Sequence, residues 1–445
     1  MSDSSEHQVW IVRHLISRTW PVVMTIVLLV VTMAYSFWWN PVIHHSQGWV
    51  IPGDLWSTFR AAHWVGWGDL GSVYGKDTAL VSFPGVAVLL APVAMISGAL
   101  GLSESIAPIF LARPTSWLVL GPVMCLLGST CLFAFDAMAE DLGVDKAKRA
   151  VLCWMEAAII FQVLAIWGHP EDLVAMALAI YALLAGFRSR VSLSAWLWGA
   201  AIVVQPLVIL MFPLALARAP KGRRFRLCVV GAVPSLVLVG TPLIAEWKAT
   251  SRVLFHQANF EYLDHATPWV ALSPRLSTIS VGAGPGRLIA IGVAVLLGIA
   301  AARWRPSWPG VIWLCALALC LRCFFEAVMV SFYLGPPLAM IVLATSLRNN
   351  WRRLWAAWTI AMIATVVSSQ RLSEWGYWIP MVILLTAGLV LAWPGQEAMA
   401  TPDSGRSRWS MGILPDPLGW GGARFPQTAA FPDQTVGTQR DHVAI

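Results

Sequence analysis

The stretch WPVVMTIVLLVVTMAYSFW, residues 20–38, decides the class of this protein. It contains no charged residue, and its length is close to the roughly 20 apolar residues that an α-helix needs to cross a bilayer. Arg13, His14 and Arg18 precede it, and it lacks the small-residue cleavage site of a signal peptide. We therefore expect a retained transmembrane helix.

The rest of the chain has the same character. Of its 445 residues, 58% are hydrophobic and only 12% are charged, and the mean hydropathy is +0.68. A soluble core could not hide so much apolar surface, so we expect an all-α, multi-pass protein of the plasma membrane with the lipid bilayer as a partner. The net charge of +7 does not indicate nucleic acid, because the basic residues form short clusters between apolar runs.

Those basic clusters predict the orientation, since Lys and Arg in short loops stay on the cytoplasmic side. They lie at residues 13–18, 146–149, 188–190, 221–226, 303–305 and 348–353. Keeping all of them inside requires residues 192–217 to cross twice as short helices, with an outer turn at Gln205-Pro206. It also requires residues 80–100, which contain Pro84 and Pro92, to make no net crossing. Both termini are then cytoplasmic.

The prediction is a bundle of about twelve spans. Besides residues 20–38 and the two short helices, we expect spans near residues 115–135, 150–167, 173–187, 227–245, 287–302, 311–321, 333–347, 354–367 and 378–393. Residues 1–394 form the membrane domain. Residues 395–445 are rich in Gly, Pro, Ser, Asp, Arg and Gln, a composition typical of a disordered tail.

The seven cysteines lie in or at the ends of apolar runs. Cys320-Leu-Arg-Cys323 has the spacing of a redox or metal pair, but no second pair accompanies it. We expect small core residues rather than a disulfide framework.

With this orientation, polar residues from distant segments gather on the outer side. The first outer loop carries His44, His45, Asp54, Arg60, His63, Asp69 and Tyr74. Later segments add Gly168-His-Pro-Glu-Asp172 and Gln205, then His256, Glu261, Asp264, His265 and Arg275, and finally Arg322, Glu326 and Tyr333. Such convergence is what an active site at a membrane surface needs.

The order of these segments resembles the GT-C membrane glycosyltransferases. The motifs are Gly53-Asp-Leu-Trp56 with Gly71-Ser-Val-Tyr74, then Phe83-Pro84 with Ala91-Pro92, Gly168-His-Pro-Glu-Asp172, Gln205-Pro206 and the stretch from Arg322 to Tyr333. Within that superfamily the chain is similar to the actinobacterial mannosyltransferases that use polyprenyl-phosphate mannose. The similarity covers residues 20 to about 393.

The resemblance implies a GT-C-like fold with a juxtamembrane helix in the first outer loop, and inverting sugar transfer on the extracytoplasmic face. The donor would be a polyprenyl-phosphate sugar, here mannose, and the acceptor an envelope glycolipid or glycan. Asp54 maps onto the general base that removes the proton of the acceptor hydroxyl. Arg322 is the expected cation beside the departing phosphate, with Arg60, His256 and His265 behind it, and Glu326 would orient Arg322. The further substrate-binding candidates are His63, His169, Glu171, Gln205 and Tyr333.

The chain departs from the family at Asp54, which is flanked by Gly53 and Leu55. Many relatives have two adjacent acidic residues there, often tied to a divalent metal. We therefore expect no cofactor, and dependence on a divalent metal stays open. His44-His45 lacks a further ligand at helical spacing, so no metal site is predicted there.

Each candidate also has a purely structural interpretation. Asp54 could cap a helix beginning at Leu55. The stretch Gly168-His-Pro-Glu-Asp172 could be a solvated loop that caps the next helix, and Arg322 with Glu326 could be an internal ion pair. For the whole protein, the rival functions are a transporter or lipid flippase, whose charges would line a substrate path, and a non-catalytic scaffold for envelope assembly.

Overall fold

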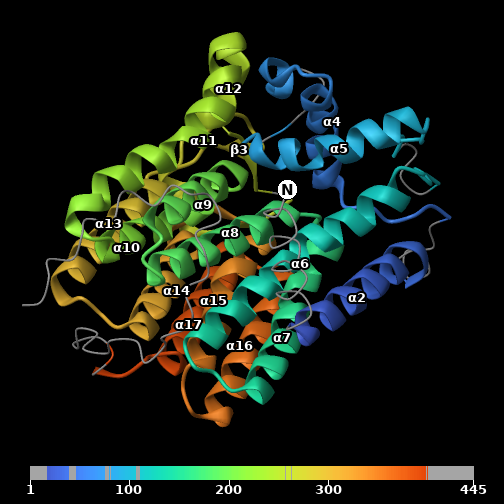
Figure 1. Cartoon of the computed structure of the whole chain (residues 1–445). Helices are drawn as coiled ribbons and strands as arrows, with labels where there is room; N and C mark the ends of the chain where they lie inside the picture. The colour runs from blue at the N-terminus through green and yellow to red at the C-terminus, as the bar shows by residue number, and fades with distance from the viewer. Residues whose placement is uncertain are drawn as a thin grey trace, which may run out of the picture. The chain divides into compact units, whose positions relative to one another are not determined.

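The computed structural model describes residues 18–39, 47–75, 80, 82–106, 111–255, 257–261, 263–396 and 398, all within the compact unit His14–Ser404. Nearly all of the predicted tail, His44, His45, His256 and most of the basic N-terminal stretch lie outside the described residues. The described part is almost entirely helical (Figure 1).

Eight helical segments in the described part are long and apolar enough to cross a membrane. They are α2 (Thr19–Ala34) with η1 (Tyr35–Trp39), α6 (Trp117–Asp141), α7 (Lys146–Phe161) with η3 (Gln162–Trp167), α8 (Pro170–Phe187), η5 (Lys221–Arg223) with α11 (Arg224–Ala245), α13 (Gly286–Trp304), α14 (Trp308–Phe325) and α17 (Glu374–Leu391). The remaining predicted crossings coincide with helices that are shorter or less apolar. These are α9 (Val191–Val204), η4 (Pro206–Met211) with α10 (Phe212–Arg218), η7 (Ser331–Leu334) with α15 (Gly335–Ser346), and α16 (Trp351–Ser368). The count of about twelve spans stays a prediction.

The helix break expected at Gln205-Pro206 is confirmed. Gln205 ends α9 with an extended backbone, φ −147° and ψ 111°, and Pro206 begins η4. Within residues 80–100 lies one helix, α5 (Gly85–Ala99), which contains Pro92 and packs on α4 (Gly53–Gly66). That this run makes no net crossing stays a prediction. Helix α4 occupies the place expected for the juxtamembrane helix, and it is followed by η2 (Leu70–Tyr74).

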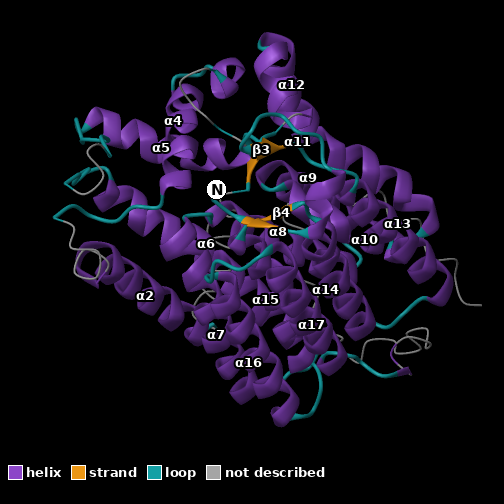
Figure 2. Ribbon diagram, turned by 180° about the vertical axis from the view of Figure 1, so that it is seen from behind, coloured by secondary structure: helices purple, strands orange, loops and turns teal. Residues whose placement is uncertain are grey.

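The segment between α11 and α13 contains α12 (Trp247–Phe255), η6 (Pro268–Leu272) and three short strands. Strand β1 (Asn259–Phe260) pairs antiparallel with β3 (Ser280–Val281), and β2 (His265–Ala266) pairs antiparallel with β4 (Val328–Met329), where His265 faces Met329. Figure 2 shows β3 and β4 between α12 and α8. The second pairing brings this segment against the end of α14.

The bundle has two chemically different ends. Asp141 at the end of α6 pairs with Arg188 after α8, and Arg18, Asp136, Glu140 and Arg149 form an ion-pair network that joins α2, α6 and α7. At the opposite end of α7 and α8 lies His169. The basic clusters and the polar stretch at residues 168–172 thus lie at opposite ends of the helices.

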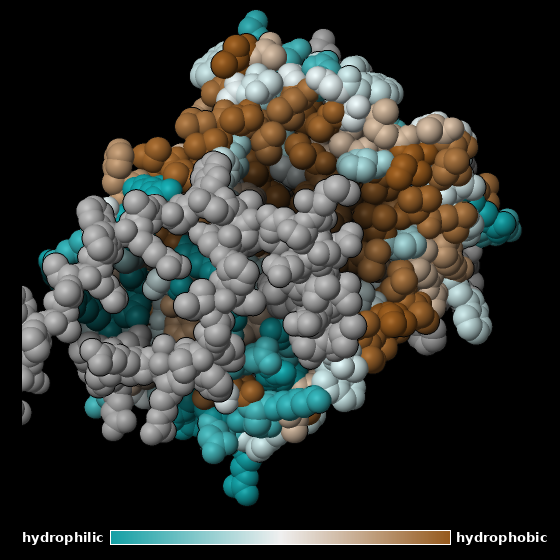
Figure 3. Space-filling view, in the orientation of Figure 1, coloured by the Kyte–Doolittle hydropathy of each residue, from teal (hydrophilic) through white to brown (hydrophobic). Residues whose placement is uncertain are grey.

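Much of the helix surface is apolar. Ile26, Val30, Val31, Leu118 and Leu126 of α2 and α6 are all exposed. Figure 3 shows hydrophobic surface on the side where α2, α5 and α6 lie. Such a surface suits a lipid bilayer rather than water. The cysteines of α14, Cys315, Cys320 and Cys323, are buried, as expected for core residues.

Candidate active site

Asp54 lies in the first turn of α4. The helix begins at Gly53 and its N-cap is Pro52, so the alternative in which Asp54 caps a helix beginning at Leu55 is wrong. The Asp54 side chain is 63% exposed, and its Oδ2 lies 3.1 Å from Nε2 of His169. The carboxylate is therefore held by one partner and open on its other side.

His169 contacts side chains of three elements: α4, α8 and η7. Its Nδ1 lies 2.7 Å from Oε1 of Glu171, and its ring stacks on Phe332 of η7 with centroids 3.5 Å apart. His169, Glu171 and Asp172 are all buried, which contradicts the interpretation of this stretch as a solvated loop. A doubly protonated imidazole would donate one hydrogen bond to each carboxylate.

The electrostatics favour that charged form. Burial opposes the charge on His169, but the charge of Glu171 and the hydrogen bond with Asp54 outweigh it and raise the pKa to about 10. The hydrogen bond from His169 in turn lowers the pKa of Asp54, against the opposing effect of burial. At neutral pH the pair is an imidazolium beside an open carboxylate.

Gly168 explains why His169 reaches Asp54. It follows η3 with a left-handed backbone, φ +68°, and a Cβ built on it would lie 2.3 Å from Cβ of Pro52 and 3.2 Å from Cβ of Leu55. Only glycine combines this backbone with so close an approach. The turn after η3 can therefore pack directly against the start of α4.

Next to this chain lies a hydrogen bond between α8 and the helix break. Nε2 of Gln205 donates to Oδ1 of Asp172 at 2.6 Å, and Asp172 is fully buried. The extended backbone at Gln205 turns its side chain toward α8. The break between α9 and η4 thus supplies a polar group to the site.

The cationic part of the site surrounds Glu326. Arg322 Nε lies 2.5 Å from one carboxylate oxygen of this residue, as the i,i+4 spacing predicts, and Arg287 Nε lies 2.9 Å from the other. The Glu326 side chain is fully buried, whereas the two arginines keep 18% and 22% of their side chains exposed. Two guanidinium groups thus share the Glu326 carboxylate.

Tyr333 and Phe332 lie between the His169 group and the arginines around Glu326. The Arg322 guanidinium lies 4.6 Å from the centre of the Tyr333 ring, and the rings of Tyr333 and Phe332 are 4.7 Å apart. Arg322 also interacts electrostatically with Asp172. The structure thereby brings together seven of the residues predicted from the sequence, which we call the Asp54 cluster: Asp54, His169, Glu171, Gln205, Arg322, Glu326 and Tyr333.

No family model, no curated protein and no solved structure matches this chain. The residues of the cluster therefore carry the functional argument by themselves.

Other predicted residues have different surroundings. His63 lies 2.6 Å from Glu104 and contacts the rings of Phe59 and Trp67, while Arg60 is exposed on α4. His265 bonds to the carbonyl of Ser368 at 2.6 Å and stacks on Tyr377. Burial lowers the pKa of His265, which makes it a poor cation at neutral pH. Substrate-binding roles for these residues, and for His256 outside the described part, stay predictions.

Three residues adjoin the cluster without having been assigned a role from the sequence, although Asp264 was named among the outer polar residues. Arg287 lies in the first turn of α13, after Gly286. A Cβ added to Gly286 would meet the carbonyl of Phe325, so this glycine lets α13 start directly beside Glu326. Phe332 stacks on His169. Asp264 is close enough to Asp54 for their charges to interact, and burial together with that charge raises its pKa to about 6. An arginine at the start of an apolar run was the sequence signal for Arg287.

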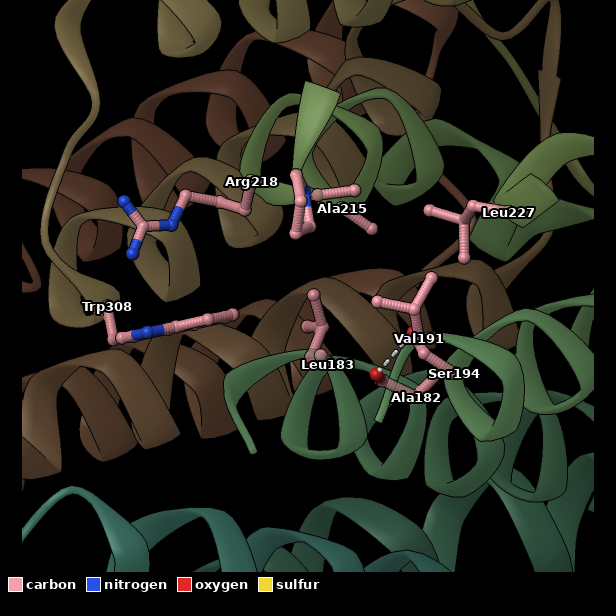
Figure 4. A pocket seen from close by; sticks show the side chains of 11 residues that line it. Ala182, Leu183, Val191, Ser194, Ala215, Arg218, Leu227 and Trp308 are labelled. Atoms are coloured by element: carbon pink, nitrogen blue, oxygen red, sulfur yellow. Dashed lines mark hydrogen bonds between the residues drawn. The ribbon is translucent and has the colours of Figure 1, made fainter. Parts of the chain in front are cut away.

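A small pocket lies away from this cluster, near the basic end of the bundle. Only about 20 Å³ of water-accessible space lies between α8, α9, α10, α11 and α14, with Arg218 above the Trp308 ring (Figure 4). It holds no carboxylate, and Ser194 in its wall is bonded to the carbonyl of Ala182. The described residues also contain no group of three or more His, Cys, Asp or Glu side chains suited to a metal ion. The Asp54 cluster is therefore the better candidate for chemistry.

Proposed function

We propose that this protein is an inverting glycosyltransferase that moves a sugar, mannose in our proposal, from a polyprenyl phosphate to an envelope glycolipid or glycan. The reaction takes place at the Asp54 cluster, on the extracytoplasmic face. The observation that carries the proposal is that an open carboxylate, Asp54, is connected through the His169, Phe332 and Tyr333 rings to two half-buried arginines.

Each part of the cluster has a task in this reaction. Asp54 accepts the proton of the acceptor hydroxyl as that oxygen attacks the anomeric carbon from the face opposite the phosphate. His169 keeps Asp54 ionised and aimed, because its second nitrogen is fixed by Glu171. The bond from the anomeric carbon to the phosphate oxygen breaks, and the half-buried guanidinium groups of Arg287 and Arg322 stabilise the negative charge that develops there.

The experiment is a transfer assay with membranes that contain the protein, using radiolabelled polyprenyl-phosphate mannose and endogenous acceptors. We expect label in an acceptor, with the anomeric configuration inverted relative to the donor. Transfer with retained configuration would contradict the single-displacement mechanism. Failure to use any polyprenyl-linked sugar would contradict the proposal as a whole.

A transporter or flippase is the second candidate, and one residue favours it. Glu156 lies in the middle of the span Lys146–Trp167, is fully buried, and neither carboxylate oxygen has a hydrogen-bond partner within the described part of the chain. Ionisable residues at this depth are often functional. In reconstituted vesicles, substrate movement that Glu156→Gln abolishes while Asp54→Asn leaves it intact would favour transport over transfer.

A further inference from the structure

Helices α14 and α17 lie side by side (Figures 1 and 2). Side chains of both helices line an apolar groove. The groove has about 470 Å³ of water-accessible space and is lined mainly by Trp313, Leu317, Phe324, Thr386, Leu389 and Val390. Only 28% of α17 is buried, so this helix faces the surrounding lipid. The groove is a lateral opening in a membrane-facing wall.

The groove runs along much of α14. Phe324 lies at the end of α14 near the Asp54 cluster, since it is two residues from Arg322 and two from Glu326. Trp313 lies near the opposite, basic end, where its ring contacts Trp393. With a rise of about 1.5 Å per residue, these two positions are roughly 16 Å apart, about the thickness of the hydrocarbon in one leaflet.

A single cation marks the basic end of the groove. Arg353, in the first turn of α16, contributes to the lining, and its backbone nitrogen is bonded to Asn350. Its side chain is half-buried, and no carboxylate of the described residues pairs with its guanidinium. Tryptophans beside it are typical of the level at which lipid headgroups lie.

We propose that this groove binds one phospholipid from the leaflet at the basic end of the bundle, with its phosphate on Arg353 and an acyl chain along α14 toward Phe324. The length of the groove suits one acyl chain, and its lining suits hydrocarbon. The Arg353 guanidinium, which no carboxylate in the described part of the chain pairs with, complements a phosphate. The site is separate from the Asp54 cluster, and the inference holds whether or not the protein transfers sugars.

The test is a titration of the purified full-length protein with phosphatidylglycerol, followed by native mass spectrometry. Arg353→Gln removes the cation, and Arg352→Gln on the same turn is its matched control, because Arg352 is exposed and does not line the groove. Thr386→Trp fills the groove, and Ile383→Trp, also exposed on α17 but outside the lining, is its control. Melting temperatures establish that each variant folds.

We expect Arg353→Gln to weaken phosphatidylglycerol binding about tenfold, the size of one lost charge-assisted contact, and Thr386→Trp to abolish it. Both controls should bind as the wild type does, and phosphate-free diacylglycerol should bind poorly to every form. Should Thr386→Trp fail to fold, the comparison of Arg353→Gln with Arg352→Gln decides alone.

Equal phosphatidylglycerol affinity in Arg353→Gln and the wild type would overturn the proposal. So would displacement of phosphatidylglycerol by a polyprenyl phosphate whose binding is blocked by Thr386→Trp but unaffected by Arg353→Gln. In that case the groove would hold a polyprenyl tail that enters from the Phe324 end.

Discussion

At the scale of single residues, the account depends on the protonation of Asp54 and His169. Asp54 is a useful base only while ionised, and the imidazolium of His169 keeps it so. Glu171, buried on the other side of the ring, supplies the charge that makes the imidazolium stable. The three side chains thus act as one unit, in which the exposed carboxylate is the member free to meet a substrate.

This arrangement predicts a pH-dependent stability. The pKa of His169 rises from 6.5 to about 10 on folding, so the protonated ring stabilises the fold fully below about pH 6.5, and that contribution is lost as the pH rises toward 10. We expect the melting temperature of the detergent-solubilised wild type to fall over this range by more than that of His169→Gln. Parallel melting curves for the two proteins from pH 6 to 10 would contradict the charged state of His169.

At the scale of elements, the turn between η3 and α8 fixes the position of His169 relative to Asp54. Its glycine has a backbone that other residues adopt at a cost of roughly 1–2 kcal/mol, and it touches Pro52 at the start of α4. The distance between His169 and Asp54 therefore depends on how closely these two elements pack.

Gly168→Ala tests this packing, and the chain offers a matched control. Gly143 also has a left-handed backbone, φ +82°, but a Cβ there would meet nothing within 4 Å. Gly143→Ala should cost about 1 kcal/mol from backbone strain alone, whereas Gly168→Ala adds the clash with Pro52 and should cost more. Thermal unfolding measures both. Transfer activity should fall only in Gly168→Ala, and equal effects on activity would argue against the contact.

The helices and their contacts also show which features of the structure could be predicted from the sequence. Apolar length predicted the helices, and Gln205-Pro206 predicted the break, because a proline cannot continue the hydrogen bonding of a helix. The pairing of Arg322 with Glu326 followed from helical spacing. The contacts of Arg287 and Phe332 with the cluster could not be predicted, because they depend on how α13 and η7 pack against distant segments. For the same reason the sequence could not distinguish His169, in the cluster, from His63, paired with Glu104.

At the scale of the whole molecule, the opposite placement of the basic clusters and the Asp54 cluster is the basis of the proposed orientation. Cysteine labelling can test it, since six of the seven native cysteines are buried. Trp67→Cys and Arg190→Cys place exposed thiols near the two ends. In intact cells a membrane-impermeant maleimide should label the cysteine at position 67 and leave the one at 190 unlabelled until the cells are opened. The reverse pattern would place the Asp54 cluster in the cytoplasm.

The central claim is that Asp54 is the base of a sugar transfer, and one measurement tests it most directly. Transfer from radiolabelled polyprenyl-phosphate mannose is measured in membranes that contain the wild type, Asp54→Asn or Asp69→Asn at matched expression. Asp69 is the control because it is an exposed carboxylate of the same segment that only caps η2, a contact that Asn preserves. Without its general base the enzyme should lose about 10²–10⁴-fold in rate, while Asp69→Asn keeps the wild-type rate. Transfer by Asp54→Asn at the wild-type rate would contradict the account.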